Sequence, residues 1–100
     1  MLNVKLIKRE REGELLLIGR IDTNTAQDAE RIMVDLAGKF DELILNMEQL
    51  EYISSAGLRA LKAAVIAMRR KGGTIVLKNV GKMVMEVLEV TGFAGMFKFV

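Results

Sequence analysis

Two consecutive serines, Ser54 and Ser55, are the residues whose types and spacing best fit a chemical role. They follow Tyr52-Ile53 and precede Ala56-Gly57-Leu58, in the segment that connects a predicted strand to a predicted helix. The first turn of a helix leaves backbone N–H groups unpaired and carries a partial positive charge, which favours an anion. A serine at that point can carry a phosphate, or it can simply cap the helix, which serines commonly do. The spacing alone favours the cap.

The composition argues against several kinds of catalytic site. The 100 residues include no Cys and no His, so the sequence lacks a thiolate nucleophile, a disulfide, and the commonest general base and metal ligand. A serine enzyme acting through Ser55 would need a nearby base, and none stands in motif spacing. Neither the P-loop nor the dinucleotide-binding glycine pattern occurs. We therefore expect a binding protein without cofactor or metal, rather than an enzyme.

The remaining composition bears on location and partners. The net charge of +2 is too small to indicate nucleic acid as a partner. No apolar run approaches the roughly 18 residues that a membrane span needs. The first five residues lack the layout of a signal peptide. We expect a cytoplasmic protein that binds neither membrane nor nucleic acid.

The apolar spacing predicts one α/β domain over residues 1–100. An opening hairpin has alternating apolar residues at 2–6, a turn at 10–13 and a continuous apolar run at 15–18 that is typical of a strand covered on both faces. Helices follow at about 25–40, 55–71 and 81–91, separated by strands at 43–45 and 74–77, with a last short strand at 97–100. This order predicts a mixed β-sheet, a hairpin followed by β-α units, with helices packed on it and the later strands largely parallel.

The helix at 55–71 has two distinct faces. Four apolar residues share one face and are expected in the core: Leu58, Leu61, Val65 and Met68. The opposite face carries Arg59, Lys62, Ile66 and Arg70. Charged helix faces are usually just solvated, whereas an apolar side chain among charges, here Ile66, is the better contact candidate.

Several segments, taken in order, resemble the STAS domain, and most closely the bacterial anti-sigma-factor antagonists. They are a Gly-Arg-Ile-Asp-Thr-Asn-Thr-Ala segment at 19–26, a strand ending in Asn46, the Ser54-Ser55-Ala56-Gly57-Leu58 helix start and a strand after Gly72-Gly73. The resemblance covers nearly the whole chain. It implies the single-domain STAS fold.

The resemblance also implies a regulatory exchange of partners. Unphosphorylated members bind a serine kinase that also serves as an anti-sigma factor, and so release the sigma factor. Phosphorylation of the serine in an Asp-Ser-Ser/Thr-Gly-Leu motif breaks that complex. Aligned on Gly57-Leu58, the accepting serine is Ser55, while Ser54 replaces the Asp of the motif and offers a decoy acceptor.

The expected partner-binding surface combines this turn with its surroundings. The resemblance places the loop at 22–24 beside the serine, although Asp22, Thr23 or Thr25 would equally suit the cap of the first helix. Asn46 is either a turn residue or a polar neighbour of the site. With the exposed helix face, the expected residues are Asp22, Thr23, Asn24, Asn46, Ser54, Ala56, Gly57, Arg59, Lys62 and Ile66.

The replacement of the motif's Asp by Ser54 leaves an alternative open. A STAS adaptor in a multiprotein regulatory or transport complex would bind its partners without a phosphate cycle. In either case we expect a monomer or a weak homodimer.

Overall fold

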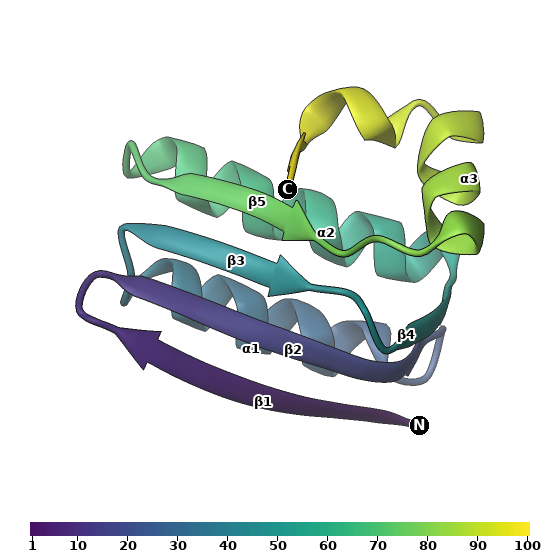
Figure 1. Cartoon of the computed structure of the whole chain (residues 1–100), viewed down its shortest axis with the longest axis horizontal. Coiled ribbons are helices and arrows are strands. Elements are labelled where there is room, and N and C mark those ends of the chain that lie inside the picture. Colours follow the sequence, from purple (N-terminus) through teal and green to yellow (C-terminus); the bar gives the residue numbers. More distant parts are fainter.

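A six-stranded mixed sheet forms the frame of the protein (Figure 1). The computed structural model describes all residues from 1 to 100. Its elements, in chain order, are β1 (Leu2–Arg9), β2 (Glu12–Ile21), α1 (Ala26–Ala37), β3 (Glu42–Asn46), β4 (Leu50–Ile53), α2 (Ser55–Arg70), β5 (Thr74–Lys78), α3 (Lys82–Val90), the 3₁₀ helix η1 (Phe93–Met96) and β6 (Lys98–Phe99).

The strand pairing confirms the predicted hairpin and the predicted parallel strands. Strand β1 pairs antiparallel with β2, and β2, β3, β5 and β6 follow one another in parallel across the sheet. The α/β class and the mixed sheet are therefore as expected. Helix α1 ends at Ala37 instead of continuing to about residue 40, and the last strand is only two residues long.

Strand β4 corrects the predicted order of elements, which has no strand between residue 45 and the serines. It pairs in parallel with the end of β2, with Ile53 opposite Ile21, after a register shift between Gly19 and Arg20. Strands β3 and β4 thus occupy successive parts of the same edge of β2. The carboxyl ends of β2 and β4 consequently lie side by side.

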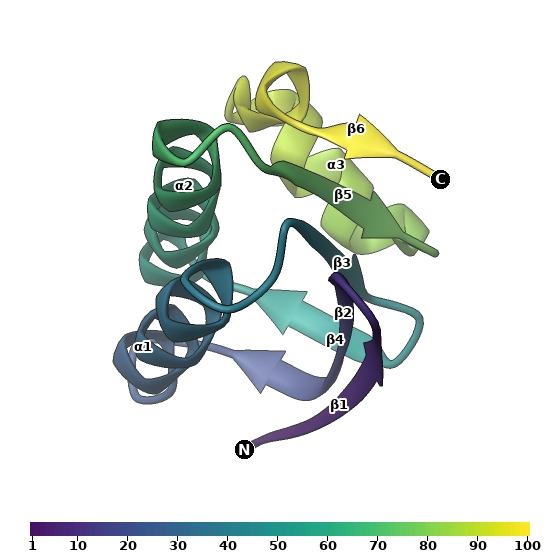
Figure 2. The same ribbon diagram turned by 90° about the vertical axis from the view of Figure 1, so that its left-hand side faces the viewer.

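Helices α1 and α2 cover one face of the sheet and leave the other face without a helix (Figure 2). The predicted core face of α2 is confirmed, because Leu58, Leu61, Val65 and Met68 are all buried. Ala60 and Ala64 are fully buried as well, and such small side chains allow α1 to pack closely on α2. Helix α3 lies against β4, at the end of the sheet where that strand enters α2 (Figure 1). No helix is both long and apolar enough to cross a membrane.

The uncovered face of the sheet differs from the prediction for residues 15–18. Leu15 and Leu17 are buried under the helices, whereas Leu16 and Ile18 point to the other face and are only half-buried. The strand is therefore covered by helices on one face, although its continuous apolar run suggested burial on both. Alternate residues of an apolar strand can stay partly exposed when flanking strands shield their edges.

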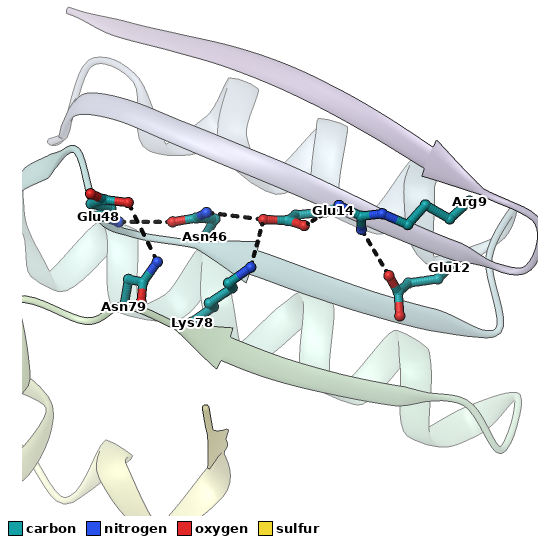
Figure 3. A network of polar contacts seen from close by, with 7 residues as sticks. All are labelled: Arg9, Glu12, Glu14, Asn46, Glu48, Lys78 and Asn79. Atoms are coloured by element: carbon teal, nitrogen blue, oxygen red, sulfur yellow. Dashed lines mark hydrogen bonds and ion pairs between the residues drawn. The ribbon is translucent and has the colours of Figure 1, made fainter.

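A buried carboxylate lies at the centre of the uncovered face (Figure 3). Glu14 is only 3% exposed, and it accepts hydrogen bonds from Arg9 Nη2 at 2.8 Å and from Asn46 Nδ2 at 2.9 Å. Lys78 Nζ lies 3.5 Å from its second oxygen. These three partners come from β1, β3 and β5, so one carboxylate on β2 links four strands.

The same contacts set the ionisation of Glu14. The hydrogen bond from Asn46, and then that from Arg9, hold the pKa of the carboxyl below its usual value, and they outweigh the opposing effect of burial. The hydrogen bonds offset the cost of burying this charge, whereas the same charge without partners would destabilise the fold.

Replacing Glu14 by Gln should weaken the pH dependence of stability. The folded-state pKa is lowered, so the contribution of the carboxylate is fully present above the unfolded value of about 4.3 and is lost as the pH falls toward the folded value. Urea unfolding of the parent and of Glu14→Gln between pH 7 and pH 3 measures this. Glu30→Gln, an exposed substitution on α1, should keep the parental profile. A full parental pH dependence in Glu14→Gln would contradict the role of this carboxylate.

Replacing Leu61 by Ala should lower the free energy of unfolding by about 2–5 kcal/mol, because a fully buried side chain leaves a cavity. Urea unfolding at neutral pH measures the loss. A loss below about 0.5 kcal/mol, the range of ordinary surface substitutions, would mean that this face of α2 does not pack on the sheet.

Candidate functional site

The ends of β2 and β4 bring two loops together at one end of the sheet (Figure 1). Strand β2 leads into the loop of Asp22, and β4 leads directly into Ser54. The backbone N–H of Ser54 donates to the carbonyl of Ile21 at 2.8 Å, which joins the two segments at the residue before Asp22. The expected proximity of the 22–24 loop to the serines is therefore present in the structure.

The two serines have different places at the start of α2. Ser54 is the N-cap residue: its backbone is extended, its Oγ accepts from the N–H of Gly57 at 3.1 Å, and its carbonyl accepts from the N–H of Leu58 at 2.9 Å. It is half-buried. Ser55 is the first residue of the helix and is exposed. The capping role thus belongs to Ser54, which leaves the hydroxyl of Ser55 at the surface beside the positive end of the helix.

Gly57 allows α2 to begin this close to the sheet. A Cβ at this position would lie 2.7 Å from Cγ1 of Ile53 and 2.8 Å from Cγ2 of Ile21, both shorter than van der Waals contact. Gly57 is buried, so its contribution is to packing, and a direct contact with a partner, as the sequence suggested, does not fit its position.

The loop after β2 is held by hydrogen bonds around Asp22. Its Oδ1 accepts from the backbone N–H groups of Asn24 at 3.0 Å and Thr25 at 3.1 Å. The hydroxyl of Thr25 accepts from the N–H of Asp22 at 2.9 Å and donates to the carbonyl of Arg20 at 3.0 Å. Thr25 is the N-cap residue of α1 by position, yet its side chain makes no capping bond, so Asp22 supplies the oxygen for this turn.

These contacts also favour the ionised form of Asp22. Loss of hydration opposes ionisation, but the hydrogen bonds from Thr25 and Asn24 outweigh it and hold the pKa of the carboxyl below its usual value. The side chains of Thr23 and Asn24 are exposed at the tip of the loop, where they are free for contacts. No group of three or more His, Cys, Asp or Glu residues is placed to hold a metal ion.

Asn46 is a turn residue, one of its two expected roles, and its expected place in the partner-binding surface is wrong. Its side chain donates to Glu14 and accepts from the N–H of Glu48 on the uncovered face of the sheet (Figure 3). Asn46 is level with Leu16 on β2, whereas Ser54 follows the pair of Ile53 and Ile21. Five residues of strand separate the two levels, or about 16 Å.

The exposed face of α2 extends from the serine turn along the helix. Ser55, Arg59 and Lys62 are exposed and stand at i, i+4 and i+7, which places them on one stripe of the helix surface. Ile66 continues this stripe, but it is half-buried, not fully exposed as the helix wheel suggested. Ala56 is half-buried too.

The structure adds two residues that the sequence interpretation missed. The guanidinium of Arg20 lies 4.3 Å from the centre of the Tyr52 ring, a distance at which a cation is attracted to the ring face. Both residues stand one position before the junction of the two loops, in paired positions of β2 and β4. The contact between Arg20 and Tyr52 depends on the pairing of β2 with β4, so it could not be predicted without recognising β4 as a strand.

A comparison of the sequence with protein-family models decides the family. The STAS domain model matches residues 4–100. The chain belongs to the STAS domain family. This STAS domain is 33% identical over 98 residues to the candidate anti-sigma factor antagonist BtrV of Bordetella bronchiseptica, a match that spans 94% of this chain and 84% of that protein.

Solved structures confirm the fold of this STAS domain. A candidate anti-sigma factor antagonist from Thermotoga maritima superposes with a TM-score of 0.84 at 18% identity, covering 98% of this chain and 84% of that one. The Bacillus cell fate determinant SpoIIAA in its phosphorylated form superposes with a TM-score of 0.74 at 16% identity, covering 100% of this chain and 91% of that one. The fold class predicted from the sequence is thus confirmed.

Replacing Gly57 by Ala should destabilise the STAS domain by about 1–3 kcal/mol, because the added methyl group overpacks the contact with Ile21 and Ile53. Gly95→Ala is the matched control, since a Cβ there meets no atom within 4 Å. Thermal and urea unfolding of both variants measure the difference. Equal stability of the two would show that the start of α2 does not rest on these two side chains.

Proposed function

We propose that this STAS domain is a bacterial anti-sigma factor antagonist. It binds a serine-kinase anti-sigma factor in the cytoplasm, and phosphorylation of Ser55 ends the complex. The 33% identity to BtrV, itself named as a candidate anti-sigma factor antagonist, supports the general role. The phosphorylated form described for SpoIIAA supports a phosphate cycle on the same fold.

The proposal rests mainly on the different places of the two serines: Ser54 caps α2, and Ser55 is exposed. Ser54 is engaged through its N–H, its carbonyl and its Oγ, so a phosphate on that Oγ would cost the cap of α2. Ser55 is exposed and its modification leaves the cap in place. The decoy acceptor is therefore the poorer substrate, and it fills the capping role that an Asp also performs well.

The chemistry of the switch follows from the place of Ser55. The kinase transfers the γ-phosphoryl group of ATP to Oγ of Ser55, ADP leaves, and the hydroxyl proton is released. The product carries about −1.5 to −2 charges at neutral pH. The N-terminus of α2 stabilises this charge, so the domain stays folded. A partner surface that fits a neutral hydroxyl must instead desolvate a dianion, which opposes binding.

The proposed contact surface surrounds this hydroxyl. It includes the exposed loop residues Thr23 and Asn24, held in place by Asp22, and it continues through Ser54 and Ala56. Along α2 the surface extends over Arg59, Lys62 and the accessible part of Ile66.

The test uses the serine-kinase anti-sigma factor encoded in the same genome, with ATP. Intact mass and peptide mapping should show one phosphoryl group on Ser55 in the parent and in Ser54→Ala, and none in Ser55→Ala. Ser55→Ala should bind the anti-sigma factor as the parent does, whereas Ser55→Asp should bind at least about tenfold more weakly, or about 1.4 kcal/mol. Ser54→Ala should lose about 1 kcal/mol of stability with its cap.

Two results would contradict this assignment. Phosphate found on Ser54 would move the switch to the other serine. Stable binding without modification of either serine would favour a STAS adaptor in a regulatory or transport complex, the function that the missing Asp of the motif also fits.

A further inference from the structure

Helix α2 carries an unbalanced charge. Its sixteen residues include four cations and no acidic residue: Arg59, Lys62, Arg69 and Arg70. Arg69 donates to the carbonyl of Met96. Arg59, by contrast, takes part in none of the ion pairs of the domain, and it is exposed. A free arginine close to the start of the helix is therefore available for an anion.

The spacing places this arginine next to the proposed switch. Ser55 and Arg59 stand at i and i+4 of the same helix, so their Cβ atoms lie about 5–6 Å apart. An anion one turn before a cation is the more favourable order for such a pair. The guanidinium offers two parallel N–H donors that match two phosphate oxygens.

We propose that Arg59 binds the phosphate once Ser55 is phosphorylated, and that modification thereby also removes this cation from the partner-facing surface of α2. The inference rests on the proposed role of Ser55. In the unmodified protein the guanidinium of Arg59 faces solvent and is open to an acidic group of the partner. In the phosphoprotein it is occupied within the chain. The partner then loses an attractive charge and meets the remaining negative charge of the phosphate.

Other charges near the serine leave room for this pair. Asp22 is the carboxylate joined most directly to the turn, but its Oδ1 is directed at the N–H groups of Asn24 and Thr25. Lys62 lies two turns from Ser55, about 10 Å along the helix axis. Arg70 lies about 22 Å away along the axis, beyond the Debye length of about 8 Å at physiological salt.

The test installs phosphoserine at position 55 during translation, so that it requires neither kinase nor partner. Phosphorus NMR then gives the second pKa of the phosphate, which is about 6 in an unperturbed phosphoserine. Arg59→Gln should raise this pKa by about 0.3 to 1 pH unit relative to the parent phosphoprotein, because an adjacent cation favours the dianion. Arg70→Gln removes the same charge from the same helix and should leave the value within about 0.1 pH unit.

The outcomes separate this inference from the proposed function. An equal phosphate pKa in the parent, Arg59→Gln and Arg70→Gln would overturn the pairing, even if a kinase modifies Ser55. A rise in Arg59→Gln alone supports the pairing, even if no kinase accepts Ser55. An equal rise in both variants would overturn it too, because it would reflect only the net charge of the domain.

Discussion

The close approach of α2 to the ends of β2 and β4 is the constraint on which the candidate site depends. Gly57 makes it possible, because any Cβ there would overlap Ile21 and Ile53. At this distance the N–H of Ser54 reaches the carbonyl of Ile21, and its Oγ reaches the N–H of Gly57. Both bonds keep Ser54 in place as the cap. The exposure of Ser55, and the position of the Asp22 loop beside it, follow from the same contact.

The two faces of the sheet are held together by different forces. On the helix face, apolar side chains from α1, α2 and the strands form one continuous core. On the uncovered face, the carboxylate of Glu14 contacts donors from three other strands of the sheet. The hydrophobic contribution is non-directional, whereas the hydrogen bonds to Glu14 depend on register. The hydrogen bonds to Glu14 therefore help to fix the register of these strands on the face where apolar packing is incomplete.

Local sequence patterns predicted those features of the fold that depend on residues close together in the sequence. The period of Leu58, Leu61, Val65 and Met68 identified the core face of α2, and the serines marked its start correctly. Strand β4 was not predicted, because four residues give little periodicity and the strand is held by its pairing with β2. Asn46 was misplaced for a related reason. Its partner Glu14 is 32 positions away, and Lys78 is 64 positions from the same carboxylate, so no local window contains the network.

The separation of the two faces of α2 has a consequence for how such proteins diversify. The residues that pack on the sheet are apolar, and the cations at Arg59, Lys62 and Arg70 are exposed. Substitutions on the exposed stripe change its charge while the buried stripe stays intact, because surface changes seldom alter stability by more than about 0.5 kcal/mol. Duplicated genes that encode this fold can therefore acquire different partners without first acquiring a different fold. If the proposed contact surface holds, a few charges on a single helix are enough to insulate parallel signalling routes within one cell from one another.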